Sequence, residues 1–364
     1  MKRKILKITA ICLAALLAAL VLIVGIYVAY VAIEYDRIED NLPLSIQNND
    51  GRNAVQTGTQ YTAVTYNVGF GAYSPEFSFF LDTGVMDDGT EVAGTHGKAL
   101  SKEDVEKNVE GSLSFVQGEN ADFVLLQEVD EDSDRNYHVD MRSAFSLTEY
   151  AQIYAVNFHS ANLLYPFHDA HGKSNSGIYT LSKFSVEQSH RRSLPLATDL
   201  SKFFDLDRCI SITRLPVDGE EREFVLINLH LSAYDEGGTI RALQLDLLKH
   251  ILQEEREAGN YVVAGGDFNH LLAETDFPDK QQTPSWIARF PEDGLPNGFS
   301  VCCATNAPTC RGADLPYEKG VNYTCVIDGF ILSDNVTVNS VQTCDLDFAF
   351  SDHNPVKLIF TLNA

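Results

Sequence analysis

The chain has 364 residues, with 27 lysines and arginines against 51 aspartates and glutamates and a formal net charge of −24. Its apolar fraction of 45% is typical of a folded protein and too high for a disordered one. The acidic excess argues against a broad nucleic-acid-binding face and against docking on anionic lipid through most of the surface. It does not exclude a metal enzyme, because carboxylates are ligands that hard cations prefer.

The first segment of the chain has a charge pattern of its own. Residues 1–33 contain four basic residues and no acidic one, so the remainder carries 23 basic residues against 51 acidic ones, a net charge of −28. Residues 8–33 form an uncharged apolar run, and a helix needs about 20 apolar residues to cross a bilayer. Because the basic residues precede the run and acidic residues follow it, we expect a transmembrane helix with residues 1–7 in the cytoplasm.

A cleaved signal peptide is the alternative interpretation of this segment. Signal peptides have a shorter apolar core and a small-residue cleavage site, whereas this run is long and no convincing A-x-A site follows it. We therefore favour an uncleaved anchor in the cell membrane. The polar residues 34–60 are interpreted as a linker, and residues 61–364 as one extracytoplasmic domain.

Short β-branched runs bounded by Gly, Asp or Asn recur through this domain and predict strands. They cover residues 61–67, 123–127, 177–181, 224–228, 261–265, 325–332 and 356–360. Two helices are expected. One begins after the N-cap Ser101 and ends near Gly118, and the other runs from Thr239 to Gly259. The apolar stripe of this second helix is Ile240, Leu243, Leu247, Leu248 and Ile251. Mixed strands and helices without a repeat predict one α/β or α+β domain.

Six cysteines lie outside the apolar run. They are Cys209, Cys302, Cys303, Cys310, Cys325 and Cys344. An extracytoplasmic location permits disulfides, and six cysteines allow 15 pairings. Disulfides and free thiols remain equal alternatives, and no C-x-x-C zinc spacing occurs.

Polar residues follow the predicted strands where these end, which is where open α/β sheets place ligands. They are Asn67, Glu128, Asn228, His230, Asp267 and Asn269, with Asp328 inside a strand-like run and Asp352-His353 before the last strand. The oxygens of Asn67, Glu128 and Asp352 suit Mg²⁺, with Mn²⁺ or Ca²⁺ as alternatives. A carboxylate partner such as Asp328 would fix the tautomer of His353. No G-x-S-x-G elbow indicates acyl transfer.

Seven motifs in order identify a family resemblance. They are Thr65-Tyr66-Asn67-Val68, Leu126-Gln127-Glu128-Val129, Ser176-Gly177-Ile178, Asn228-Leu229-His230-Leu231, Gly266-Asp267-Phe268-Asn269, Ile327-Asp328 and Ser351-Asp352-His353-Asn354-Pro355-Val356. This order resembles the endonuclease/exonuclease/phosphatase superfamily, which includes deoxyribonucleases, sphingomyelinases and inositol polyphosphate phosphatases. Each motif alone is weak, but seven in order make chance matching improbable.

The resemblance implies an α+β fold, namely a four-layer α/β/β/α sandwich of two packed mixed sheets flanked by helices. It also implies divalent-metal hydrolysis of a phosphate ester by in-line attack of water. By the same resemblance Glu128 is the main metal ligand, with Asn67 beside it and Asp352 near the metal. Asp267 orients or deprotonates the water, Asn269 and His353 contact phosphate, and Asp328 partners His353. His230 matches a family histidine, and Arg208 and Asn175 are weaker candidates for phosphate contacts.

The substrate class stays open at this stage. Phosphodiesters are favoured slightly over monoesters, with phospholipid head groups, nucleic acid and small diesters as the candidates. The net charge of −28 disfavours nucleic acid, whereas an anchor favours lipid. The alternatives are a monoesterase on inositol or sugar phosphates and a non-catalytic binding module that retains the fold. No protein partner is implied, and no exposed aromatic hairpin that would insert into a bilayer is evident from the sequence.

Overall fold

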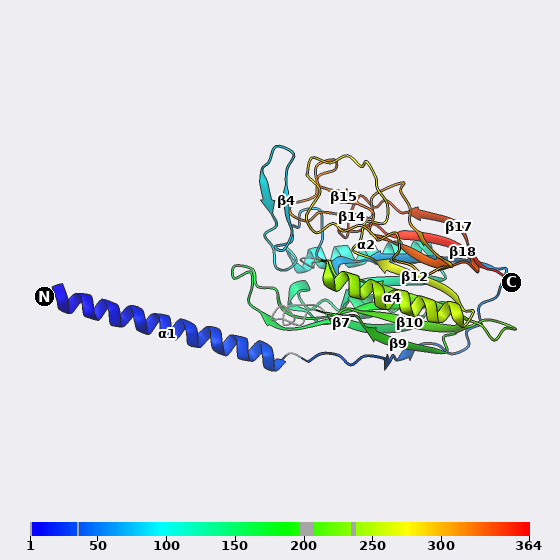
Figure 1. Cartoon of the computed structure of the whole chain (residues 1–364), viewed down its shortest axis with the longest axis horizontal. Coiled ribbons are helices and arrows are strands. Elements are labelled where there is room, and N and C mark those ends of the chain that lie inside the picture. The colour runs from blue at the N-terminus through cyan, green and yellow to red at the C-terminus, as the bar shows by residue number, and fades with distance from the viewer. Residues whose placement is uncertain (1, 35, 197–206, 234–237) are drawn as a thin grey trace.

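A computed structural model describes residues 2–34, 36–196, 207–233 and 238–364. The first element is α1 (Lys2–Glu34), which projects from one end of the folded domain (Figure 1). Among the described residues it is the one helix that is long and apolar enough to cross a membrane. A signal sequence would meet the same criterion of length and composition.

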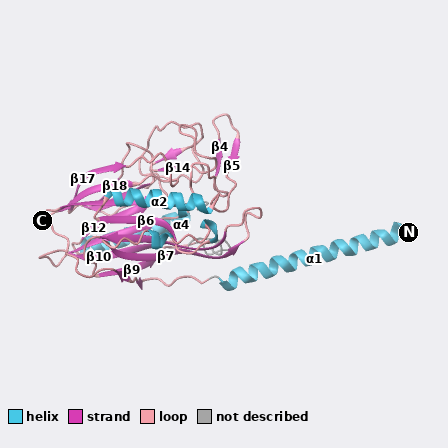
Figure 2. Ribbon diagram, turned by 180° about the vertical axis from the view of Figure 1, so that it is seen from behind, coloured by secondary structure: helices cyan, strands magenta, loops and turns pink. Residues whose placement is uncertain are grey.

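Two seven-stranded mixed sheets form the centre of the described domain (Figure 2). In order, the first sheet is β17 (Val336–Thr343), β18 (Val356–Leu362), β3 (Gln60–Asn67), β6 (Phe123–Asp130), β8 (Gly172–Ser182), β7 (Ala151–Leu163) and β2 (Ile46–Gln47). The second is β1 (Leu42–Pro43), β9 (Gln188–Ser193), β10 (Cys209–Pro216), β11 (Glu223–His230), β12 (Tyr261–Asp267), β16 (Asp328–Ser333) and β13 (Phe299–Cys302). The pairs β3–β6 and β11–β12 are parallel and the other neighbours are antiparallel.

Smaller elements complete the described domain. They are β4 (Thr83–Val85) with β5 (Glu91–Ala93), β14 (Cys310–Arg311) with β15 (Thr324–Cys325), α3 (Met141–Ala144), and two 3₁₀ turns, Gly69–Gly71 and Asp134–Asn136.

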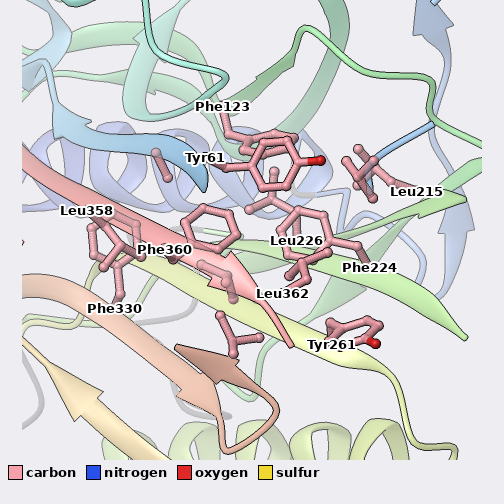
Figure 3. Packing of buried hydrophobic residues seen from close by; sticks show 14 of the residues in the cluster. Tyr61, Phe123, Leu215, Phe224, Leu226, Tyr261, Phe330, Leu358, Phe360 and Leu362 are labelled. Atoms are coloured by element: carbon pink, nitrogen blue, oxygen red, sulfur yellow. The ribbon is translucent and has the colours of Figure 1, made fainter. Parts of the chain in front are cut away.

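The core lies between the sheets, and one helix covers each outer face. Tyr61 and Phe123 of the first sheet pack against Phe224 and Tyr261 of the second (Figure 3). On the outer face of the first sheet, α2 (Lys102–Glu119) packs through Val105, Val109 and Val116. On the outer face of the second, α4 (Thr239–Glu257) packs through Leu245, Leu248 and Leu252. This order of layers confirms the four-layer α/β/β/α sandwich predicted from the sequence.

The helix boundaries match the sequence signals closely, and the expected apolar stripe of α4 is right at Leu248 and Ile251 but wrong at Leu243. The Ser101 side chain accepts from the backbone N–H of Asp104, and Asn120 in the left-handed conformation ends α2. In α4 the buried face consists of Arg241, Gln244, Leu245, Leu248, Ile251, Leu252 and Glu255. Leu243 is exposed instead, because two polar side chains, Arg241 and Gln244, bond to backbone carbonyls of distant loops and so turn that face inward.

The strand boundaries differ more. The run 325–332 divides into β15 and β16, and the structure adds β7, β9, β10, β13 and β17, which no apolar run had indicated. These strands carry polar side chains at many positions. Polar residues interrupt the alternation of apolar and polar positions in these strands, so period-two patterns alone did not reveal them.

The segment 34–60, expected to be a linker, is not a free tether where the structure describes it. Its residues supply β1 and β2, which pair with β9 and β7, and Val55 is fully buried in the core between the sheets. The folded unit therefore begins near Leu42, earlier than the boundary expected at residue 61.

All seven cysteines are free thiols in the structure. Disulfides and free thiols were the two alternatives that the sequence left open, and the structure has the free thiols. Cys310 and Cys325 face each other across the β14–β15 pair, and both are buried.

Candidate active site

Six strand ends bring the polar motif residues to one edge of the sandwich. Asn67 ends β3, His230 ends β11 and Asp267 ends β12, while Glu128 lies near the end of β6. Since β16 runs antiparallel to β12, its first residue, Asp328, lies opposite Asp267. The antiparallel strand β18 likewise begins beside the end of β3, which places the preceding Asp352 and His353 at the same edge.

Asp267 is the centre of the cluster. Its Oδ2 atom lies 3.1 Å from Nδ2 of Asn67, 3.4 Å from Nε2 of His230 and 3.6 Å from Nε2 of His353. Its Oδ1 atom accepts the backbone N–H of Asn269 at 2.8 Å, which fixes the rotamer of the carboxylate. Burial raises the pKa of Asp267 to about 6, against the lowering effect of His353. A carboxylate with a pKa near neutrality is suited to accept a proton from water.

His353 forms a buried pair with Asp328. Its Nδ1 atom lies 2.8 Å from Oδ2 of Asp328, and both side chains are nearly inaccessible. Burial works against the imidazolium, but the charges of Asp328 and Asp267 outweigh it and raise the pKa of His353 well above its usual value. The ring is therefore a cation whose Nε2–H faces the cluster, which is the arrangement needed to bind an anionic oxygen.

Glu128 and Asp352 form the second part of the site. Glu128 has a φ of +56° at a bulge between β6 and β8, so its side chain leaves the regular alternation of the strand. Burial and the charge of Glu128 raise the pKa of Asp352 to about 7, while His353 and Arg311 act to lower it. The carboxylates of Glu128 and Asp352 lie close enough to repel each other. They are a donor set that fits a hard divalent cation, because the cation offsets this repulsion.

Asn67 lies between the carboxylates of Glu128 and Asp267, and its role as an oxygen ligand stays a prediction. Its amide oxygen accepts the backbone N–H of Gly69 at 3.0 Å, and its amide nitrogen donates to Oε1 of Glu128 at 3.1 Å. In this structure Asn67 therefore orients the carboxylates of Glu128 and Asp267 and presents a donor to the site. A second candidate set for a metal, Asp267, Asp328 and His353, has ligand atoms within 4.8 Å of one another.

His230 contributes a neutral ring to the cluster. Burial lowers its pKa well below the usual value, and the charges of Arg208, His353 and Arg135 act in the same direction. Its Nε2 lies 3.4 Å from Asp267 and 3.9 Å from Oε1 of Glu128, whereas its buried Nδ1 has no hydrogen-bond partner among the described residues.

The remaining expected residues fall into two groups. Asn269 lies in the cluster, where its side chain donates to the carbonyl of Leu231, and Arg208 is buried close enough for its charge to act on His230. Asn175 is not brought into the cluster, because its amide donates to Oε2 of Glu131 at 3.1 Å. It lies at the rim on β8.

Two buried arginines beside the site were missed by sequence reasoning. Arg135 forms a two-point ion pair with Asp130 at 2.7 and 2.9 Å, stacks on Phe70, and lies close enough to Glu128 for their charges to interact. Arg311 is fully buried, and its charge acts on Asp352. Asp130 at the end of the largely apolar strand β6 was the one signal for Arg135, since a buried carboxylate requires a partner.

The sequence profile described as "Endonuclease/Exonuclease/phosphatase family" matches residues 64–353, which span the whole cluster. The chain belongs to the endonuclease/exonuclease/phosphatase family. Members of this family are divalent-metal-dependent and act on phosphate esters such as nucleic acids, so the general kind of activity is that of a phosphoesterase. No curated protein matches the chain.

Solved structures share the fold at low sequence identity. An endonuclease/exonuclease/phosphatase from Beutenbergia cavernae is 14% identical, with 84% of this chain and 72% of that chain covered at a TM-score of 0.54. The human Nocturnin catalytic domain with bound sulfate is 17% identical, with 86% and 98% covered at a TM-score of 0.51. TDP2 from Caenorhabditis elegans is 16% identical, with 84% and 75% covered at a TM-score of 0.50. These likenesses concern the fold alone.

Proposed function

We propose that this protein is a Mg²⁺-dependent phosphodiesterase whose catalytic domain lies outside the cell membrane, held there by an uncleaved α1. The observation that supports it most is the convergence on Oδ2 of Asp267, where Asn67, His230 and His353 lie at 3.1, 3.4 and 3.6 Å. A binding module that had lost its chemistry would not be expected to retain this full set of buried groups.

Glu128 and Asp352 are the residues we assign to the metal. Mg²⁺ bound there would offset the charge that develops on the phosphoryl oxygens. The alternative set around His353 is less suitable, because Nδ1 of that ring and Oδ2 of Asp328 already bond to each other at 2.8 Å.

The chain's own residues supply the proton chemistry in this proposal. Asp267 orients the attacking water and takes its proton, with Asn67 and the N–H of Asn269 holding the carboxylate in place. The imidazolium of His353 donates to a phosphoryl oxygen, and Asp328 fixes the orientation of the ring and stabilises its charge. His230 is neutral and lies beside Asp267, where it can donate to the phosphoryl or leaving oxygen.

Three buried arginines also bear on the substrate. Arg135, Arg208 and Arg311 surround the cluster although the rest of the domain is strongly acidic. Among the described residues, these three positive charges gather around a site the size of a single phosphate, although Asp130 neutralises that of Arg135. This arrangement favours a substrate with one phosphodiester, such as a phospholipid head group, over a polynucleotide.

The test uses the full chain in detergent with a bis-aryl phosphodiester. We expect hydrolysis with Mg²⁺, loss of hydrolysis with EDTA, and a loss of about 10²–10⁴-fold in kcat for His353→Ala or Asp267→Ala. The exposed His250 on α4 provides the control, since His250→Ala should leave the rate unchanged. Metal-independent turnover, or His353→Ala and Asp267→Ala rates equal to the control, would contradict the proposal.

A parallel assay on sphingomyelin, DNA, RNA, inositol phosphates and an aryl monophosphate decides the substrate class. Faster turnover of monoesters would replace the diesterase with a monoesterase. Binding of the substrates without any turnover would indicate the non-catalytic module.

A further inference from the structure

Exposed apolar side chains gather at the tip of the β7–β8 hairpin. Outside α1, the described residues include six exposed large apolar side chains: Leu81, Leu164, Tyr165, Phe167, Leu243 and Val338. Three of them belong to the hairpin, where Leu164 is 46%, Tyr165 60% and Phe167 87% exposed. Leu81 follows Phe80, whose ring lies 5.5 Å from that of Tyr165. We call Leu81, Leu164, Tyr165 and Phe167 the apolar tip.

The apolar tip lacks the charge that covers the rest of the domain. Residues 150–168 contain no Asp, Glu, Lys or Arg, although 21% of the chain is charged. The first acid after the tip, Asp169, turns back to the domain, where it accepts the N–H of Gly97 at 3.0 Å and lies 3.7 Å from Nζ of Lys98. A contiguous exposed apolar surface without charge marks an interaction site.

The last turns of α1 bind directly to this hairpin. The hydroxyl of Tyr27 donates to the carbonyl of Asn162 at 3.2 Å and accepts the N–H of Leu164 at 3.1 Å, and Tyr30 accepts the N–H of Asn162 at 3.2 Å. These backbone groups lie on the free edge of β7, so the tyrosines satisfy them. Val31 is buried at the same contact, and both ribbon views show α1 and the hairpin leaving the same end of the molecule (Figures 1 and 2).

This contact sets the depth of the tip relative to a bilayer that α1 would cross. At about 1.5 Å per residue, the ~30 Å hydrocarbon core takes up about 20 residues of the apolar run that starts at Ile8. The core then ends close to Tyr27, and tyrosine prefers this boundary. The apolar tip, bonded to Tyr27, lies at the boundary between acyl chains and head groups.

We propose that the apolar tip inserts into the outer leaflet beside α1 and thereby holds the catalytic edge against the membrane surface. The tip and the site share one edge of the first sheet, because the strand end that carries Glu128 and Asp130 pairs with β8 at Ser176 and Gly177, shortly after the hairpin turn. The proposal rests on α1 being retained as an anchor and does not depend on the assigned catalytic roles. Two anchoring points would orient the domain, which α1 alone would not.

The first test measures the depth of the tip by quenching. Full-length Phe167→Trp is reconstituted in phosphatidylcholine vesicles whose acyl chains carry bromine near the head group, and Trp286, the one native tryptophan, supplies the background. The control is Val338→Trp on β17, which is exposed but lies at the opposite end of the first sheet. We expect bromine to remove most of the emission added at residue 167 and none of that added at residue 338. Equal quenching at the two positions, or none at either, would overturn the proposal.

The second test separates the tip from the chemistry. Phe167→Asp should slow hydrolysis of a vesicle-embedded phosphodiester several-fold and leave hydrolysis of the soluble bis-aryl diester unchanged. If Phe167→Asp slows hydrolysis of both substrates equally, the apolar tip does not act through the membrane and the proposal is overturned. If the wild type hydrolyses neither substrate, the proposed function fails, while the quenching result still decides the membrane contact.

Discussion

Nδ1 of His353 lies 2.8 Å from Oδ2 of Asp328, and the opposite ring nitrogen faces Asp267 at 3.6 Å. The imidazole thus bridges two carboxylates, one on each side. Asp328 stabilises the charge of the ring, and Asp267 is the group beside which a water would be activated. Asp267 is the last residue of β12, and Asp328 is the first residue of the neighbouring strand β16. The register between the two strands therefore sets the distance between the two carboxylates.

Replacing Asp328 tests this relationship. Asp328→Asn preserves the shape of the side chain but removes the charge that stabilises the imidazolium, so we expect kcat to fall about 10²–10⁴-fold with little change in KM. Steady-state kinetics on the bis-aryl diester measure the effect. Asp334→Asn, at a surface pair with Arg256, should retain full activity. An Asp328→Asn enzyme as fast as Asp334→Asn would show that the ring needs no carboxylate.

Metal binding by Glu128 predicts a thermal shift. Because a ligand stabilises only the folded state, Mg²⁺ at about 100 times its Kd should add about 2.7 kcal/mol to the free energy of unfolding. We expect Glu128→Gln to lose this gain, as monitored by thermal unfolding of the full chain with and without Mg²⁺. The matched control is Glu131→Gln, whose carboxylate bonds to Asn175 and Arg142. Equal shifts in both variants would contradict the assignment of Glu128.

The buried ion pair between Arg135 and Asp130 predicts a large effect on stability. Arg135→Met leaves Asp130 as an unpaired carboxylate with no solvent exposure, and we expect a loss of about 3–5 kcal/mol in the free energy of unfolding. Arg256→Met breaks an exposed pair and should cost about 0–1 kcal/mol. Denaturant unfolding of the two variants gives the comparison. Similar losses would mean that Arg135 is not needed to neutralise Asp130.

His171 predicts an acid-sensitive stability. Its ring is buried beside Arg135, with Nδ1–H donating to the carbonyl of Gly97, and burial lowers its pKa to about 4. The unfolded chain takes up this proton near pH 6.5, so stability falls as the pH drops from about 6.5 to 4, by about 3 kcal/mol at most. His171→Asn keeps the donor but cannot be protonated, so its unfolding free energy should depend less on pH. Measurement at several pH values, with His250→Asn as the exposed control, decides this; parallel slopes for wild type and His171→Asn would refute it.

The amino-acid sequence by itself determined much of this protein. Apolar runs located β3, β6, β11, β12 and β18, a serine cap located α2, and the residues after these strands were the ones that meet at the site. The reason is physical: strand ends, caps and apolar runs are local signals, and residues at the carboxyl ends of parallel strands must share an edge. The motif order was also sufficient to predict the family.

The tertiary structure alone decided the rest. Arg135 and Arg311 join the site through contacts between segments far apart in the sequence, and Asn67 presents its amide nitrogen because Gly69 occupies its oxygen. Residues 42–47 enter the sheets because β7 and β9 have free edges there, although the segment 34–60 as a whole is polar. An exposed aromatic hairpin was not evident from the sequence either. The packing of α1 against β7 brings Tyr165 and Phe167 beside the apolar helix, because segments that are distant in the sequence meet only in the folded chain.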